Sequence, residues 1–90
     1  MKQEELILEL EAVAGQLGIT IRYEKGDFEG GYCILKAQKL LLINKRLTPA
    51  RKAALLAVAL EEIGLDTLFV KPALRAFIED EARKAQRRAS

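Results

Sequence analysis

The stretch GYCILKAQKLLLINKRLTP, residues 31–49, decides the fold of this chain of 90 residues. Its first part predicts a β-hairpin with strands at 32–36 and 39–44, because apolar β-formers fill both runs. The turn is placed around Ala37 and Gln38, although it lacks the Asn-Gly or Asp-Gly pair that marks two-residue hairpin loops most strongly. A hairpin makes its two strands antiparallel neighbours.

Upstream of this stretch, the pattern predicts a helix and a strand. Apolar residues recur at helical spacing through residues 3–17, and Gly18 follows where a left-handed residue ends many helices. Apolar and polar side chains alternate through residues 19–24, as in a strand with one buried face. The glycine-rich segment 25–31 is predicted to be a loop.

Downstream, two helices are predicted. A hydroxyl N-cap followed by proline indicates that one helix starts at Thr48, and its apolar face runs to Ile63. The connector 65–70 is either a loop or an edge strand. Pro72 opens the last helix, whose basic end at 83–90 is predicted to fray.

The predicted order of elements, α-β-β-β-α-(β)-α, describes one compact α+β domain over residues 1–90. We expect an antiparallel three-stranded sheet packed with three helices. The composition is that of a globular chain, since 50% of the residues are hydrophobic and 31% are charged. A chain of this length buries only about 60–65% of its unfolded surface on folding. Formation of an oligomer, which would bury more surface, is therefore one of the alternatives.

Missing residue types exclude several kinds of site. The chain has no histidine and one cysteine, and its only serine is Ser90. Structural zinc sites use four Cys or His ligands, and a Ser-His-Asp triad needs a histidine. We therefore expect no metal, no cofactor and no catalytic residues. The longest apolar run, 40–43, is far shorter than the ~20 residues of a membrane-spanning helix. With one cysteine and no signal-peptide pattern, the prediction is a cytoplasmic protein without membrane contact.

Few side chains are candidates for chemistry. Cys33 lies in an apolar strand without a histidine to lower its thiol pKa, so core packing is favoured over a redox or catalytic role. Glu61 and Glu62 are neighbours on a helix and diverge in direction. The acidic run 79–81 lies within one turn of Arg75 and Arg83, which favours exposed ion pairs over an acid/base dyad.

The segment from Gly31 to Cys33, together with the run from Leu42 to Pro49 and the helix behind it, resembles the front half of ImmA/IrrE-type metallopeptidases, a minimal gluzincin fold. In that family a strand ending in Ile-Asn leads into a helix carrying His-Glu-x-x-His. Matching Asn44 to the family pattern places this motif on residues 58–62. Both histidine positions are then replaced, by Val58 and Glu62, and the general-base position is Ala59. The resemblance covers about residues 19–64 and implies the fold without the zinc chemistry.

Two further segments resemble a family of small uncharacterised bacterial proteins. The segments Gly30-Gly31-Tyr32-Cys33 and Pro72-Ala73-Leu74-Arg75 match its Gly-Gly-x-Cys and Pro-Ala-x-Arg features. No activity comes with this resemblance, which implies relatives of similar length and nothing about their task.

Charge is distributed unevenly along the chain. Residues 30–60 contain no acidic residue, and they include the basic residues Lys45, Arg46, Arg51 and Lys52 beside a predicted helix N-terminus. One interpretation is a face that binds nucleic acid or another anion. The other is a solvated face, or one that complements an acidic helix of a neighbouring molecule. Aromatic residues for base stacking are scarce near it, and the net charge is only +2.

The run Leu40, Leu41, Leu42 and Ile43 favours an oligomer. Successive side chains of a strand point to opposite faces, so this run makes both faces of its strand apolar. The first two helices can cover one face, and only the short apolar face of the third is left for the other. We therefore expect a non-catalytic interaction or structural protein that acts as a homo-oligomer, most simply a dimer, or as a subunit. A nucleic-acid- or anion-binding module is the alternative, and an enzyme with a composite site between subunits is a third.

Overall fold

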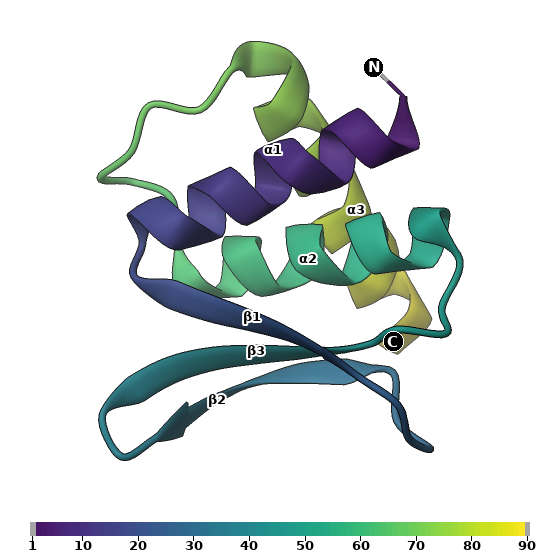
Figure 1. The fold of residues 1–90 in the computed structure, drawn as a ribbon. Helices are drawn as coiled ribbons and strands as arrows, with labels where there is room; N and C mark the ends of the chain where they lie inside the picture. The colour runs from purple at the N-terminus through teal and green to yellow at the C-terminus, as the bar shows by residue number, and fades with distance from the viewer. Residues whose placement is uncertain (1, 90) are drawn as a thin grey trace.

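The computed structural model describes residues 2–89, apart from the side chains of Cys33 and Ala89. It confirms an α+β fold with three helices (Figure 1). The elements are α1 (Gln3–Gln16), β1 (Ile19–Glu24), β2 (Gly30–Leu35), β3 (Gln38–Asn44), α2 (Pro49–Ile63) and α3 (Pro72–Ala89).

The three strands form a mixed sheet in the order β1-β3-β2. The central strand β3 is antiparallel to β2, as the hairpin predicts, but it is parallel to β1. The expectation of a fully antiparallel sheet is therefore wrong. The linker 25–29 carries the chain from one edge of the sheet to the other, so β3 returns between the two outer strands and runs in the direction of β1.

The hairpin loop consists of Lys36 and Ala37, whose φ angles are 50° and 67°. Two consecutive residues with positive φ form the type I′ geometry, which matches the twist of paired strands. The turn therefore comes one residue earlier than predicted. Gly30 and Gly31, which the sequence analysis assigned to a loop, belong to β2 and pair with Ile43 and Leu42.

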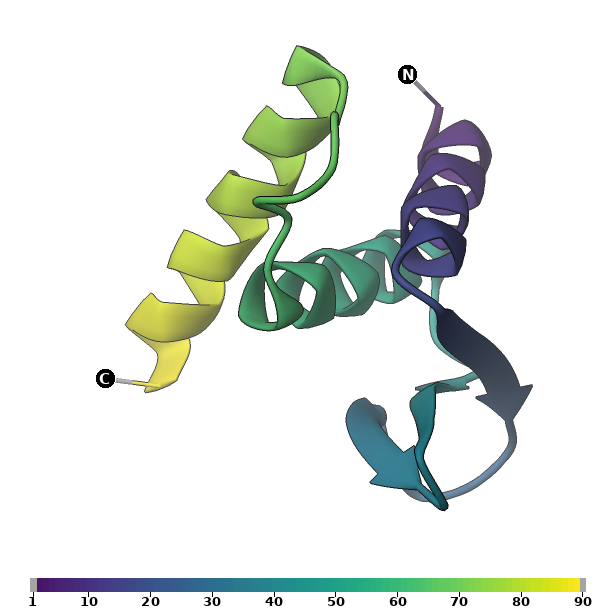
Figure 2. The same cartoon turned by 90° about the vertical axis from the view of Figure 1, so that its left-hand side faces the viewer.

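All three helices lie on the same side of the sheet. Figures 1 and 2 show α1 and α2 next to the sheet and α3 on the far side of α2. Contacts between elements agree, because α3 packs against α2 and α1, whereas α1 and α2 contact the strands. The third helix, which the sequence left as the only one available for the second face of the sheet, packs on α2 and α1 instead, so within residues 2–89 that face carries no helix.

The core lies between the sheet and the helices. Its fully buried large side chains come from every layer: Leu10, Leu41, Ile43, Leu56, Leu60, Leu74 and Ile78. Leu41 and Ile43, which the sequence analysis offered as interface residues, are thus part of the core. Leu40 and Leu42 alternate with them and point to the helix-free face, where Leu40 is buried and Leu42 half-buried.

The connector 65–70, for which the sequence left a loop and an edge strand open, is a loop. It contains a turn closed by a hydrogen bond from the Leu68 N–H to the Leu65 carbonyl at 3.0 Å. Helix α3 is helical to Ala89, and the fraying of its basic end stays a prediction. Ion pairs along its surface, from Asp80 to Arg83 at 3.3 Å and to Lys84 at 3.2 Å, support the helix there.

Within residues 2–89, none of the helices combines the length and apolar character that crossing a membrane requires.

Candidate interaction site

The outer edge of β2 is open. The N–H of Asn44 donates to the Glu29 carbonyl at 2.9 Å, so these two residues form a hydrogen-bonded pair of the antiparallel ladder. Since hydrogen-bonded and non-bonded pairs alternate, Gly30, Tyr32 and Ile34 direct their N–H and C=O groups away from β3. Within residues 2–89 no hydrogen bond of the main chain or side chains fills these positions.

This edge also lacks the usual protection against pairing. Native edge strands are guarded by charged side chains, prolines or bulges. The other edge strand, β1, carries Arg22 and Glu24, which form an ion pair at 2.8 Å. In contrast, β2 consists of Gly-Gly-Tyr-Cys-Ile-Leu without a charge or a proline, and its Ile34 and Leu35 are 65% and 56% exposed. The sequence of β2 thus favours pairing with another strand.

A hollow of about 160 Å³ lies beside this edge, between the sheet and α2. Its walls are mostly apolar, with one carboxylate: Gly30, Gly31, Tyr32, Leu41, Ile43, Leu55, Val58, Ala59 and Glu62. A second hollow, between α2 and α3, shares Val58 and Glu62 with the first. Figure 2 shows the carboxyl end of α2 extending past β2, with α3 beyond it. A strand added to β2 would therefore lie beneath α2.

The two glycines at the start of β2 have different reasons to be there. A Cβ on Gly30 would lie 2.5 Å from the carbonyl oxygen of Leu42, which is too close for any side chain. A Cβ on Gly31 would meet nothing within 4 Å. Gly30 is therefore needed for the sheet itself, whereas Gly31 leaves open space next to the edge.

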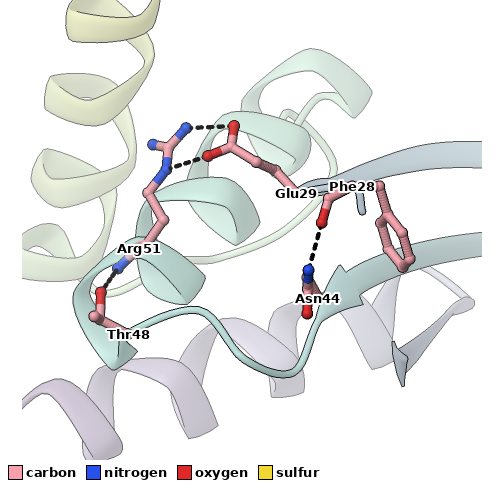
Figure 3. Close-up of polar contacts among 5 residues, drawn as sticks. All are labelled: Phe28, Glu29, Asn44, Thr48 and Arg51. Atoms are coloured by element: carbon pink, nitrogen blue, oxygen red, sulfur yellow. Dashed lines mark hydrogen bonds and ion pairs between the residues drawn. The ribbon is translucent and has the colours of Figure 1, made fainter. Parts of the chain in front are cut away.

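Asn44 holds the start of β2 in place. Its side chain is 9% exposed, and its Nδ2 donates to the carbonyls of Gly26 at 2.8 Å and Phe28 at 2.6 Å. Its Oδ1 accepts the Arg46 N–H at 3.0 Å. Figure 3 shows the bond from Nδ2 to the Phe28 carbonyl. These bonds tie the linker to the end of β3. In the sequence, Asn44 stands out only through a family pattern, because an amide side chain gives no sign of its partners.

One residue of the predicted basic site is neutralised by an ion pair. Arg51 forms a two-bond ion pair with Glu29, with Nε and Nη2 at 3.0 and 2.9 Å from the two carboxylate oxygens (Figure 3). The hydrogen bond to Arg51 lowers the pKa of the Glu29 carboxyl and raises the pKa of the guanidinium. The same residue is held by Thr48, whose hydroxyl accepts the Arg51 N–H at 3.2 Å and confirms the predicted N-cap.

The other three basic residues, Lys52, Lys45 and Arg46, have different surroundings. The ammonium of Lys52 lies 5.6 Å from the centre of the Tyr23 ring, as in a cation–π contact. The Tyr23 hydroxyl donates to Glu11, and partial burial together with this bond raises the pKa of Tyr23. Lys45 and Arg46 are exposed and form no ion pair within residues 2–89. The four cations therefore do not converge on one free anion site.

The residues mapped onto the metallopeptidase motif do lie together. Val58, Ala59 and Glu62 all line the hollow beside β2. Among the described residues, no group of three or more His, Cys, Asp or Glu side chains could hold a metal ion there or elsewhere. Cys33 pairs with Leu40 through the main chain, and its side chain lies outside the described part. The arrangement offers binding surfaces and hydrogen-bonding groups, without a cluster of reactive side chains.

Comparisons with known protein-family models, curated proteins and solved structures found no match. The two resemblances noted from the sequence therefore stay predictions.

Proposed function

We propose that this protein is a non-catalytic interaction protein, which acts as a homo-oligomer or as a subunit, and that it binds an extended chain segment along the free edge of β2. The observation that carries the proposal is an open, uncharged edge strand directly beside an apolar hollow.

Two kinds of contact support this function. Main-chain groups of Gly30, Tyr32 and Ile34 offer a hydrogen-bonding pattern that any extended segment can meet. The hollow then supplies selectivity, because side chains on alternate positions of an added strand point toward α2. Glu62 at its rim favours a segment with a basic side chain, since no ion pair occupies this carboxylate within residues 2–89.

The test is to pan a library of random linear peptides against the protein at nanomolar concentration. Enriched peptides are then titrated into labelled protein, and the amide shifts are mapped. We expect the shifts to concentrate on β2 and on the face of α2 that holds Val58 and Glu62. Peptides that bind only elsewhere, or a library that yields no binder, would contradict the proposal.

The matched variants are Ile34→Pro and Ile34→Ala. Proline removes an N–H that points away from β3, so it blocks the edge without removing a bond of the sheet. Alanine shortens the same exposed side chain and keeps the N–H. Peptide binding should be lost in the first variant and retained, at reduced affinity, in the second.

The alternative function, binding of nucleic acid or another anion, depends on Lys45 and Arg46, the exposed members of the predicted basic set. It requires that binding of a duplex oligonucleotide fall steeply with salt, because counterions are released. The double variant Lys45→Glu, Arg46→Glu should then abolish binding. Retention that is unchanged in this variant would remove the alternative.

A further inference from the structure

We propose that the segment bound along β2 is β2 of a second copy of this chain, so that two sheets join across a two-fold axis into one continuous six-stranded sheet. This inference rests on the proposed function and names its partner.

Hydrogen bonding restricts the register. In an antiparallel pair of identical strands, the outward groups of one copy must meet the outward groups of the other. Pairing Tyr32 with Ile34 of the second copy satisfies this rule. The two-fold symmetry then also pairs Ile34 with Tyr32 of the second copy, so two hydrogen-bonded pairs form. The same register sets Gly30 opposite Lys36 of the second copy, and places the two Cys33 residues opposite each other at the axis as a non-hydrogen-bonded pair.

The side chains fit this register on both faces. On the helix side, Ile34 of the second copy lies next to Tyr32 and enters the hollow walled by Leu55 and Val58. This covers a side chain that is 65% exposed in the single chain. On the other face, Leu35 of the second copy lies opposite Gly31, where a side chain is absent and space is open. A large residue thus stands across from a small one at both ends of the pair.

Charge favours the same arrangement. Asp27 and Glu29 precede β2, with Glu29 already paired with Arg51, and Lys36 and Lys39 flank the turn after it. Antiparallel pairing brings the basic turn of one copy to the acidic end of the other. Parallel pairing would instead place like charges together.

This interface differs from the one predicted from the run 40–43. That run lies in the central strand, whose two neighbours are already present, and Leu41 and Ile43 belong to the core. The free edge is one strand away, on β2.

The first experiment measures mass by sedimentation equilibrium from micromolar to millimolar concentration. Wild type and the control Leu8→Lys, which changes an exposed apolar residue of α1, should approach twice the 10.0 kDa chain mass. Ile34→Pro and Ile34→Lys should stay at the chain mass throughout, with the circular dichroism of a folded protein. Ile34→Lys keeps the N–H and places a charge in the hollow, so it tests the interface even where proline disturbs the strand.

The second experiment tests the register with mild oxidation. The two Cys33 Cα atoms should lie about 4.5 Å apart across the axis, within the range of a disulfide. Wild type should therefore form a covalent dimer. In a Cys33→Ser, Ile34→Cys variant, the two cysteines are offset to about 8 Å, and cross-linking should fall at least tenfold.

The outcomes separate the two proposals. A wild-type chain that stays monomeric at millimolar concentration overturns the dimer, and so does a dimer that survives both Ile34→Pro and Ile34→Lys. A dimer broken by these variants but not cross-linked through Cys33 overturns the register. If the dimer fails while library peptides still bind along β2, the proposed function stands with a different partner.

Discussion

Gly30 and Gly31 are neighbours in the sequence, but only one of them is required by the sheet. Alanine at Gly30 brings a methyl group to 2.5 Å from the Leu42 carbonyl oxygen, so β2 must shift. We expect Gly30→Ala to lower the free energy of unfolding by about 1–3 kcal/mol, the range for overpacking. Chemical denaturation monitored by circular dichroism measures this.

The matched change Gly31→Ala meets open space and should leave the free energy of unfolding within about 0.5 kcal/mol of wild type. Equal losses in the two variants would show that the close approach of Gly30 to β3 is not what matters.

Tyr23 makes stability depend on pH in the alkaline range. Its pKa is raised in the folded protein by burial and by the bond to Glu11. In the unfolded chain, the hydroxyl ionises near pH 10. The folded state therefore holds the proton more tightly, and its advantage is complete below pH 10 and is lost as pH rises above that value.

We expect the free energy of unfolding of wild type to fall more steeply between about pH 9.5 and 11 than that of Tyr23→Phe. The two proteins differ only at this position, so the difference between the two curves isolates Tyr23. Parallel curves would mean that the Tyr23–Glu11 bond contributes nothing.

At the scale of elements, local pattern predicted most of the structure. The helices from Gln3 and Pro49 and the strand from Ile19 follow from side-chain periodicity, caps and glycines, and the structure confirms them. The order of the strands could not be predicted in the same way. The strand order depends on the linker 25–29, which crosses the sheet, and on the Asn44 side chain, which donates hydrogen bonds to that linker. Both features bring together residues that are far apart in sequence.

The candidate site was predicted only in part for the same reason. The basic residues were visible as a charge pattern. The partners of Arg51 and Lys52 are Glu29 and the Tyr23 ring, which come from the first third of the chain, and their proximity arises only on folding. The open edge of β2 was missed because an edge strand is defined by its neighbours, not by its own residues.

The turn of the hairpin is an element under strain. Ala37 adopts φ 67°, which places its Cβ close to the main chain and costs about 1–2 kcal/mol compared with an ordinary conformation. Glycine at this position removes the cost of the positive φ, but it raises the conformational entropy of the unfolded chain, which partly offsets the gain. We expect Ala37→Gly to stabilise the protein by about 0.5–1 kcal/mol.

Thermal denaturation should show this as a rise in Tm of about 2–8 °C. Glycine at Gln38, the first residue of β3, serves as the control and should destabilise. A lower Tm for Ala37→Gly would contradict the type I′ turn.

At the scale of the whole molecule, one layer of helices on one side leaves the sheet with an open edge and an open face. Acidic and basic segments neutralise each other within the chain, as in the pairs Arg51–Glu29 and Lys71–Glu9. Near β2, Lys36 follows its end and Asp27 precedes its start, and neither forms an ion pair within residues 2–89. This asymmetry suits an antiparallel pair of copies.

A charge reversal tests this directly. Lys36→Glu should weaken self-association about three- to tenfold at low salt, because it brings a further carboxylate toward Asp27 and Glu29 of the second copy. High salt should reduce the difference from wild type, because exposed charges are screened. An affinity that is unchanged in this variant at low salt, measured by sedimentation, would show that Lys36 does not approach the acidic residues before β2.

The central claim is that the free edge of β2 pairs with a second strand. The most direct measurement is amide hydrogen exchange of Tyr32 and Ile34, by NMR, at low micromolar and at millimolar protein concentration. Their N–H groups point away from β3, whereas the N–H groups of Gly31 and Cys33 point toward it. The account predicts that Tyr32 and Ile34 exchange rapidly in dilute protein and become protected at least tenfold at high concentration, while Gly31 and Cys33 are protected at both. Exchange of Tyr32 and Ile34 that is independent of concentration, in a protein that self-associates, would contradict it.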